Sequence, residues 1–339
     1  MNCRISVIVP NRNGAKTIGM CLEALFRSVY DGFEVIVVDD FSSDDSVAVI
    51  RGYPCRLIAL GRQHGAAAAR NIGAGQSRGE LLFFIDADCL VQEDTLHLAE
   101  ELAAAWGKET VIGGTYTCRP HDLGFYSLFQ SLFIHFSEGK RGQSCDYIAG
   151  HAMLIARETF RQSGGFPADF LPLIEDVEFS HRLRAGGYRL VMERALQVRH
   201  IFNFRGFWDS LLNGFRKSKY WVVYSLANRD LFADSGTASH ELKGTVVLWF
   251  LLLITAGLNL FYPGPVSLQL LLGAASADIL LNRRLFALFY RSEGGFFAAR
   301  AAGYYLLLYP PAVAVGALVG ALEYVTGRRP VLRLGVEGR

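Results

Sequence analysis

The chain contains 339 residues, of which 51% are hydrophobic and 19% are charged. This composition excludes a disordered chain, which needs low hydrophobicity and a high net charge. The 34 basic and 32 acidic residues nearly balance, so the overall charge gives no support for nucleic-acid binding. From residue 244 onward, Arg and Lys outnumber Asp and Glu by 8 to 4, and most of the long apolar runs lie there. We therefore expect a soluble domain over residues 1–243 and a membrane domain over residues 244–339.

The first 90 residues alternate between strand-like and helix-like segments. Apolar runs predict strands at residues 5–9, 33–38, 57–60 and 80–85. Helical spacing or polar helix starts predict helices at residues 16–28, 44–51 and 66–76. This alternation predicts an α/β fold with a mostly parallel sheet. Ligands of such sheets bind beyond the carboxyl ends of the strands, where several polar residues of this chain fall.

The alternation weakens after residue 90. Helices are expected at residues 94–106, 125–136 and 177–185. Strands are expected at residues 111–117, 189–192 and 196–198, and within 147–155 after Gly150. An aromatic and basic helix follows near residues 202–224. Two interpretations of this helix stay open: it packs on the catalytic core, or it lies at the interface of an anionic membrane.

The tail contains two or three hydrophobic helices. They are predicted near residues 245–262, 266–281 and 301–322, and the first has the length of a transmembrane helix. Pro310 and Pro311 must kink the third. The segment 282–300 is polar and basic, which predicts a loop on the cytoplasmic side of the membrane. The third segment then either crosses the membrane or folds back.

The remaining sequence features bear on the cellular location of the protein. The six cysteines form no Cys-x-x-Cys pair, which favours a reducing environment. The apolar run at residues 5–9 is too short for the core of a signal peptide. We therefore expect a protein of the cell inner membrane, or an equivalent membrane, with its catalytic domain in the cytoplasm.

Two acidic pairs follow predicted strands. Asp86 and Asp88 come directly after the run Phe83-Phe84-Ile85 and can share a hard cation. Mg²⁺ and Mn²⁺ prefer such oxygen ligands, together with substrate phosphates. Asp39 and Asp40 end the second strand, where they suit either a helix cap or a contact with a nucleobase N–H. The first strand lacks a Gly-x-Gly-x-x-Gly turn, which argues against a dinucleotide-dependent oxidoreductase.

Taken together, these segments resemble the family 2 glycosyltransferases, which have the GT-A nucleotide-sugar-binding fold. The matching pieces are Ser6-Val7-Ile8-Val9-Pro10 with Asn13, Val37-Val38-Asp39-Asp40 with Ser42, Ala69-Arg70-Asn71-Ile72-Gly73, Phe84-Ile85-Asp86-Ala87-Asp88, Ala149-Gly150, Gly164-Gly165-Phe166, Glu175-Asp176 and His200. The resemblance covers roughly residues 4 to 201 and leaves out the tail.

The resemblance implies a role for each matching residue. Asp176 is the expected catalytic base, with Glu175 beside it to orient the acceptor or the base, and Gly150 in the acceptor loop. The residues expected to bind the nucleotide sugar are Pro10, Asn13, Asp39, Asp40, Arg70 and Asp86. Asp88, Asp86 and His200 are expected to hold Mg²⁺ or Mn²⁺. For Arg70, a solvated charge on a helix is the alternative interpretation.

The function implied is inverting, metal-dependent transfer of a single sugar from a nucleoside-diphosphate sugar, with UDP as the expected nucleotide. The acceptor is expected to be membrane-associated and lipid-linked. Processive synthases of the family carry Gln-x-x-Arg-Trp, and neither Trp208 nor Trp221 lies in that frame. Two alternatives stay open: a processive polysaccharide synthase, and a membrane-anchored, non-catalytic transferase-like subunit.

Overall fold

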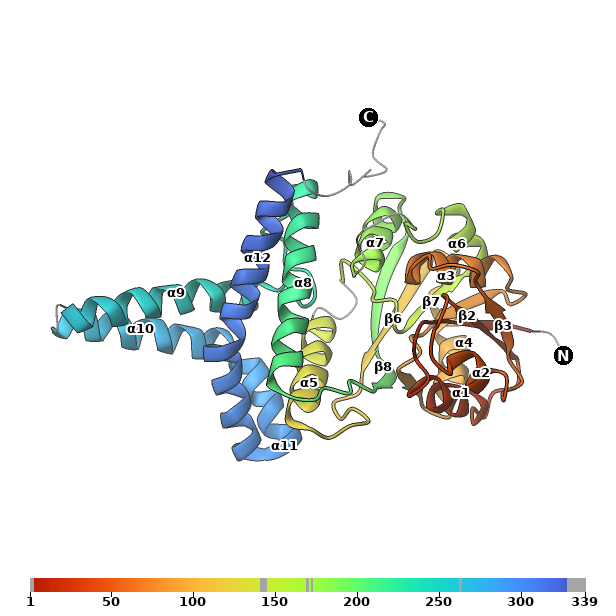
Figure 1. The fold of residues 1–339 in the computed structure, drawn as a ribbon, viewed down its shortest axis with the longest axis horizontal. Coiled ribbons are helices and arrows are strands. Elements are labelled where there is room, and N and C mark those ends of the chain that lie inside the picture. Colours follow the sequence, from red (N-terminus) through yellow and green to blue (C-terminus); the bar gives the residue numbers. More distant parts are fainter. Residues whose placement is uncertain (1–2, 141–144, 169–170, 172, 262–263, 328–339) are drawn as a thin grey trace. The chain divides into compact units, whose positions relative to one another are not determined.

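The computed structural model describes residues 3–140, 145–168, 171, 173–261 and 264–327 (Figure 1). The chain divides into two compact units, Met1–Asn203 and Phe204–Arg339. The helix expected near residues 202–224 packs with the second unit, so this division falls before the boundary expected at residue 243.

The first unit is built on one eight-stranded sheet with the order β3-β2-β1-β4-β7-β6-β8-β5. Its parallel half consists of β1 (Ile5–Asn11), β2 (Phe33–Asp39), β3 (Arg56–Ala59) and β4 (Leu81–Phe84). The connecting helices are α1 (Ile18–Phe26), α2 (Ser46–Ile50) and α3 (Ala66–Gly75). The predicted strands and helices of this half are confirmed, and the α/β fold with them.

The other half of the sheet is mixed. It contains β5 (Cys89–Val91), β6 (Thr110–Tyr116), β7 (Met153–Ala156) and β8 (Arg189–His200). β7 runs antiparallel to β4 and β6, and β5 runs antiparallel to β8. The helices of this half are α4 (Thr95–Trp106), α5 (Phe125–Gly139), α6 (Arg157–Gln162) and α7 (Glu175–Ala185).

The strand expected after Gly150, within residues 147–155, begins at Met153, and before it Ile148 N–H donates to Ser180 Oγ (3.0 Å). One prediction for this half was wrong in detail. The two short strands expected at residues 189–192 and 196–198 are one strand, β8, whose pairing with β6 shifts register between Gly113 and Thr115.

A cluster of four aromatic rings supports the middle of the sheet. Phe84 of β4 contacts Phe160 and Phe166, with ring centroids 5.2 and 5.1 Å apart, and Phe166 contacts Phe179 of α7 at 4.7 Å. All four side chains are buried. Burial of side chains this large is worth about 2–3 kcal/mol each, so the cluster fixes α7 against the sheet next to the end of β4.

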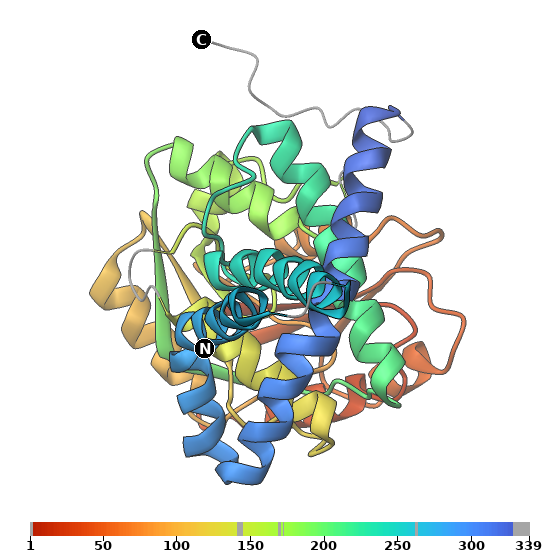
Figure 2. The ribbon, with the colours of Figure 1, turned by 90° about the vertical axis from the view of Figure 1, so that its left-hand side faces the viewer.

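The second unit is helical. Its elements are α8 (Phe207–Asn228), α9 (His240–Phe261), α10 (Pro265–Leu281), α11 (Arg283–Gly303), the π-helical turn η2 (Tyr304–Leu308) and α12 (Tyr309–Val325). α9 and α10 form a hairpin whose helices lie side by side (Figures 1 and 2). Two helical stretches, His240–Phe261 and Arg283–Val325, are long and apolar enough to cross a membrane.

The segment 282–300 is a helix, α11, and the prediction of a loop there was wrong. Its apolar residues explain the helix, because Phe286 packs on Tyr305 and Phe289 on Phe297 inside the same unit. Gly294 breaks the helix with a φ of 83°. The predicted distortion at Pro310 and Pro311 takes the form of η2, a wider turn that ends at Leu308, two residues before the first of these prolines, both of which lack a backbone N–H.

Candidate functional site

A buried arginine joins the acidic residues at the carboxyl end of β4. Arg70 of α3 donates from Nη2 to Asp86 Oδ1 and from Nη1 to Glu175 Oε1, both at 2.7 Å. Its guanidinium also lies over the Phe166 ring, 5.4 Å from the centroid. Only 5% of Arg70 is exposed, so the alternative of a solvated helix charge is wrong. One guanidinium therefore ties the end of β4 to the start of α7.

The positive and negative charges of Arg70, Asp86 and Glu175 do not balance. Burial alone would raise the pKa of Asp86, but the Arg70 guanidinium and its hydrogen bond lower that pKa below the ordinary value. Burial also opposes the charge on Arg70, whereas Asp86 and Glu175 raise the pKa of the guanidinium. The single positive charge of Arg70 thus pairs with two carboxylates, and an additional cation would be electrostatically favourable here.

Three potential metal-binding side chains meet where β5 pairs with β8. Ligand atoms of Asp88, Cys89 and His200 lie within 4.8 Å of one another, and His200 Nε2 is 3.4 Å from Asp88 Oδ1. The pairing of Cys89 with His200 across the two strands produces this proximity. Burial, and then the charge of Asp86, raise the pKa of Asp88 to about 7. A cation at this place would relieve that repulsion.

These donors fit a hard divalent cation. The carboxylate of Asp88 and the imidazole of His200 are ligands that Mn²⁺ accepts. Burial raises the pKa of the Cys89 thiol well above its ordinary value. Sulfur ligands also suit softer metals than Mn²⁺ or Mg²⁺, so Cys89 is the weakest of the three candidates for a hard cation. Asp86 was expected beside Asp88 as a ligand, and one of its oxygens is engaged by Arg70.

Asp176 lies at the start of α7, beside the loop that contains Gly150. Its Oδ2 accepts from Gly150 N–H (3.1 Å) and its Oδ1 from Val177 N–H (2.9 Å). Burial and the neighbouring charge of Glu175 raise the pKa of Asp176 to about 7. A carboxylate with such a pKa can accept a proton near neutral pH, which is what a general base does.

Gly150 also lies against Arg70. A Cβ atom at this position would lie 3.0 Å from Arg70 Cζ, so a larger residue would require the guanidinium to shift slightly. The predicted residues Gly150, Glu175 and Asp176 therefore share one place with Arg70 and Asp86.

The ends of β1 and β2 form a second polar group. Asp39 Oδ1 accepts from Asn11 Nδ2 (2.7 Å) and from Ser42 Oγ (2.6 Å), and Asp39 is buried. Asn13 is exposed and its Oδ1 accepts from Ser43 N–H at 2.8 Å. Pro10 pairs with Val38 in register, one residue before the end of β1. Asn11, which the sequence interpretation did not single out, connects the two strand ends.

Asp40 organises a loop in this structure. Its two oxygens accept from the backbone N–H groups of His64 (2.6 Å) and Gly65 (2.8 Å), just before α3 begins. Asp40 is buried, and these bonds place the start of α3, from which Arg70 projects. The carboxylate thus supports the site through the backbone of that loop.

A buried histidine that the sequence interpretation missed lies behind the acidic cluster. His151 follows Gly150, and its Nε2 is 3.6 Å from Glu138 Oε2. Burial opposes the charge on His151, but Glu138 raises its pKa above the ordinary value. The Tyr116 ring lies between His151 and His200, with centroid distances of 4.1 and 4.7 Å. Residues from α5, β6 and β8 meet here, so no local sequence pattern signals the cluster.

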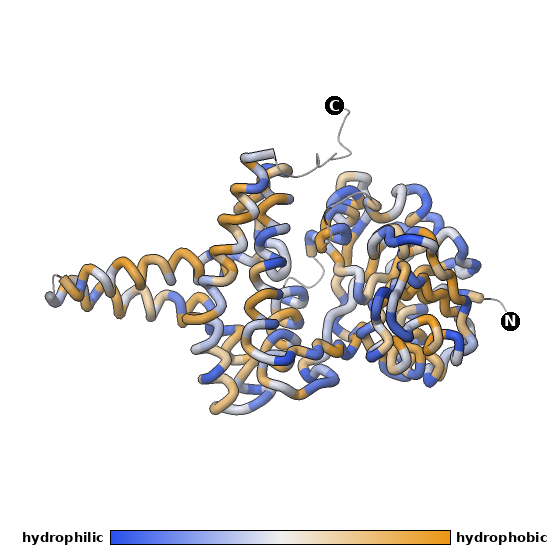
Figure 3. The backbone as a smooth tube through the Cα atoms, viewed as in Figure 1, coloured by the Kyte–Doolittle hydropathy of each residue, from blue (hydrophilic) through white to orange (hydrophobic). Residues whose placement is uncertain are grey.

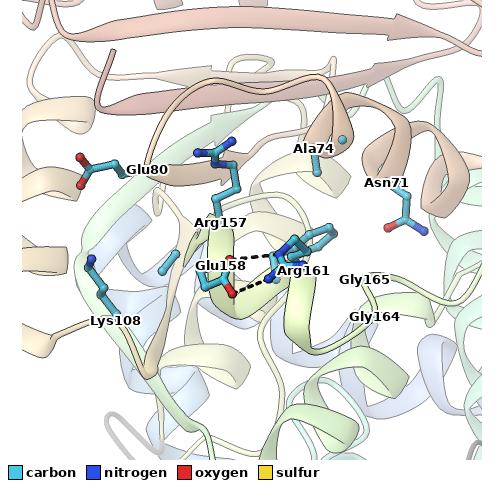
Figure 4. A pocket seen from close by; sticks show the side chains of 12 residues that line it. Asn71, Ala74, Glu80, Lys108, Arg157, Glu158, Arg161, Gly164 and Gly165 are labelled. Atoms are coloured by element: carbon cyan, nitrogen blue, oxygen red, sulfur yellow. Dashed lines mark hydrogen bonds and ion pairs between the residues drawn. The ribbon is translucent and has the colours of Figure 1, made fainter. Parts of the chain in front are cut away.

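A separate pocket of about 590 Å³ lies at the opposite end of β4 (Figure 4). It lies beside Glu80, which directly precedes the strand, and its walls carry Lys108 and Arg157. Arg161 bonds both carboxylate oxygens of Glu158 at its rim, at 3.0 and 2.7 Å. The site residues predicted from the sequence all lie elsewhere.

Comparison with known proteins finds similarity to glycosyltransferases. Residues 6–164 match the family model for glycosyl transferase family 2. Glycosyltransferase AglE of Haloferax volcanii is 28% identical over 243 residues, covering 68% of this chain and 78% of that protein. Glycosyltransferase GlyG of Streptococcus pneumoniae is 30% identical over 127 residues, covering 36% of this chain and 42% of that protein.

An uncharacterized glycosyltransferase of Haemophilus influenzae is 31% identical over 186 residues, 53% of this chain. The match spans 61% of that protein, so for this relative and for GlyG it covers less than two thirds of the relative's length.

Among solved structures, the mannosyltransferase PcManGT of Pyrobaculum calidifontis, in complex with GDP-Man and Mn²⁺, is similar with a TM-score of 0.58. It is 21% identical, and the match covers 97% of this chain and 89% of that chain. This likeness confirms the GT-A fold.

Proposed function

We propose that this protein, a family 2 glycosyltransferase, transfers a single sugar, with inversion, from a nucleoside-diphosphate sugar to a membrane-associated, lipid-linked acceptor. The observation that carries the proposal is the Arg70 bridge, which joins Asp86 on the donor side to Glu175 beside the expected base. A transferase needs the donor and the acceptor base at a fixed spacing, and a buried guanidinium with two carboxylate partners provides it.

The proposed reaction is a direct displacement. Asp176 accepts the proton of an acceptor hydroxyl as the new bond from that oxygen to the anomeric carbon forms. The bond from the anomeric carbon to the diphosphate breaks, and the nucleoside diphosphate leaves. A single displacement inverts the anomeric carbon, and the raised pKa of Asp176 supports its role as the base. Gly150 N–H and Glu175 would orient the base and the acceptor.

Asp88 and His200 would hold Mn²⁺ or Mg²⁺, with Asp86 beside them, and PcManGT, which binds Mn²⁺ and GDP-Man, supports that class of cofactor and donor. When bound, the cation would neutralise charge on the leaving diphosphate. We propose that Pro10, Asn13 and Asp39 line the nucleotide end, that Asp40 supports it through the loop before α3, and that the nucleotide is UDP. Asn13 is exposed at this end, which supports such a contact.

The membrane part of the proposal is supported by the stretch His240–Phe261, which is long and apolar enough to cross a membrane. Confining enzyme and acceptor to one interface raises their effective concentration. The catalytic unit would face the cytoplasm at the inner or an equivalent membrane, where nucleotide sugars supply the donor.

The test is release of nucleoside diphosphate by the full chain, with UDP-sugars and GDP-sugars, with and without Mn²⁺ or Mg²⁺. The acceptor is a lipid extract in detergent, and the product is analysed by mass spectrometry and by NMR of the new anomeric bond. One added sugar of inverted configuration supports the proposal. A ladder of products would favour the processive synthase, and absence of release with every donor would favour the non-catalytic subunit.

A further inference from the structure

The apolar helices of the second unit differ in how they are exposed. In α9 the buried residues are Leu242 and Thr245, both near its start. Among the residues of α10 whose side chains the structure describes, Asp278 alone is buried. In α12, by contrast, one face is buried, and large exposed side chains form a stripe at Val315, Leu318, Leu322 and Val325. Figure 3 shows the hydrophobic colouring along both α9 and α10.

The α9–α10 hairpin has the properties of a membrane insert. No charged residue occurs from Gly244 to Ala277. α9 has 22 residues, so it is about 33 Å long, close to the ~30 Å hydrocarbon core of a bilayer. A pair of helices satisfies its own backbone hydrogen bonds, as lipid requires.

The base of the hairpin is polar and basic. Thr245 Oγ1 donates to Asp278 Oδ1 (2.7 Å), and Asn282 Nδ2 donates to Thr245 Oγ1 (2.8 Å). These bonds join the start of α9 to the end of α10, so both ends of the hairpin lie at one level. Lys243, Arg283 and Arg284 flank this level in the sequence, as expected for a segment that meets anionic headgroups on the cytoplasmic side.

α12 is packed along α8. A Cβ atom on Gly316 would collide with Phe215 and Ser218, and one on Gly320 would collide with Lys219, so the two backbones are in close contact. Glycines four residues apart permit such an approach between helices. Lys219 Nζ also forms an ion pair with Glu323 Oε1 at 2.6 Å. Residue numbers rise together along both helices, which makes the pair parallel.

This packing bears on whether α12 crosses the membrane. Gly316 lies near the middle of α12, level with Phe215, which directly precedes Arg216 and Lys217 of α8. If α12 spanned the bilayer, those two cations would lie at mid-depth, where charged side chains are strongly disfavoured. The exposed apolar stripe on one side of α12 is instead typical of a helix lying in the interface.

We infer that the α9–α10 hairpin is the segment that enters the hydrocarbon core, and that α12 lies beside α8 at the surface of the membrane. The start of α9 and the end of α12 are then on the same side of the membrane. This inference rests on the membrane part of the proposed function. The sequence left open whether the third hydrophobic segment, predicted near residues 301–322, crosses the membrane, and the inference is that it does not.

The test is a depth measurement on the full chain in vesicles of phosphatidylethanolamine and phosphatidylglycerol. The half-buried Cys3, Cys55 and Cys118 are replaced by Ser, and the buried Cys21, Cys89 and Cys145 are kept. Single cysteines for a spin label are then introduced at Leu253, Leu272 and Leu318, which are 51%, 57% and 61% exposed and therefore matched. Collision with oxygen reports hydrocarbon, and collision with a nickel chelate reports water.

The expected result is an oxygen-to-nickel ratio several-fold higher at Leu253 and Leu272 than at Leu318. A ratio at Leu318 equal to that at Leu253 would overturn the inference for α12, and water exposure at Leu253 would overturn it for the hairpin. Epitope tags on both ends of the otherwise unaltered chain provide a second measurement, in which protease is expected to reach both tags from the same face. Tags on opposite faces would also contradict the inference. Nucleotide release measured on the same vesicles keeps the proposed function separate, since loss of release with this depth profile counts only against that function.

Discussion

Replacing Asp176 by Asn is expected to slow turnover and stabilise the fold at the same time. Turnover should fall about 10²–10⁴-fold, because the amide keeps the shape of the side chain and removes the group that accepts the proton. The wild-type enzyme should lose activity below pH 7, where Asp176 becomes protonated. With a pKa of about 7, roughly one tenth of the base is ionised at pH 6, so turnover there should be about a tenth of that at pH 8.

The stability effect follows from the same pKa. Asp176 titrates near 3.8 in the unfolded chain and at about 7 in the fold, so the folded state holds the proton more tightly. The free energy of unfolding therefore falls as the pH rises from about 4 to 7, and the full loss is present above pH 7. At about 1.4 kcal/mol per pKa unit, the loss is at most about 4 kcal/mol, and Asp176→Asn removes it.

The assay is thermal unfolding of the full chain in detergent at pH 4, 6 and 8, alongside turnover at pH 6 and 8. Asp176→Asn should unfold at a higher temperature than the wild type at pH 8 and at the same temperature near pH 4. Glu178→Gln is the matched control, since Glu178 lies on the same helix and pairs with Arg182 at 3.0 Å. It should keep turnover and gain no stability. A variant at Asp176 with wild-type turnover, or with lower stability at pH 8, would refute the reasoning.

Three further changes test other parts of the structure. Glu175→Gln should lower the free energy of unfolding by about 3 kcal/mol, because buried Arg70 loses one of its two carboxylate partners; denaturant unfolding measures this, and wild-type stability would contradict the bridge. Asp88→Ala should leave the unfolding temperature of the metal-free protein unchanged or raise it, because burial and Asp86 already oppose the charge of Asp88. The same variant should lose the stabilisation by added Mn²⁺. An undiminished response to Mn²⁺ would show that the metal ligand lies elsewhere. Gly316→Val should separate α8 from α12, since a Cβ atom there meets Phe215, and should increase proteolysis within α8; an unchanged cleavage pattern would argue against their close packing.

The parallel half of the sheet was predictable because each of its strands has a recognisable pattern in the local sequence. The runs at residues 5–9 and 33–38 are β-branched, continuous and closed by polar residues, which is the pattern of a strand buried on both faces. The mixed half was less predictable, because its elements depend on distant partners. Residues 147–152 have the composition of a strand, yet the backbone of Ile148 and Gly150 bonds to side chains of α7.

The residues of the candidate site also fall into those that the sequence predicted and those that depend on distant contacts. Asp86 and Asp88 follow a recognisable strand end, so residue type and position pointed to them, whereas the resemblance to the family pointed to Asp176. The burial of Arg70 and the charge partners it acquires depend on contacts among α3, β4 and α7, which no window of sequence contains. His151 and Glu138 are further examples, since a lone histidine has no local signature until α5 and the loop after Gly150 are brought together.

The antiparallel pairing of β5 with β8 has a consequence for the order in which the protein is made. Cys89 pairs with His200, so a strand near the middle of the first unit can pair only after the strand at the end of that unit has been made. Forming such a long-range contact requires closing a large loop, which slows folding relative to local pairing. During synthesis, Asp88 therefore cannot meet His200 until nearly the whole first unit has left the ribosome. The apolar hairpin starts only at His240, shortly after that point, so the completion of the first unit and the emergence of the hairpin are close in time.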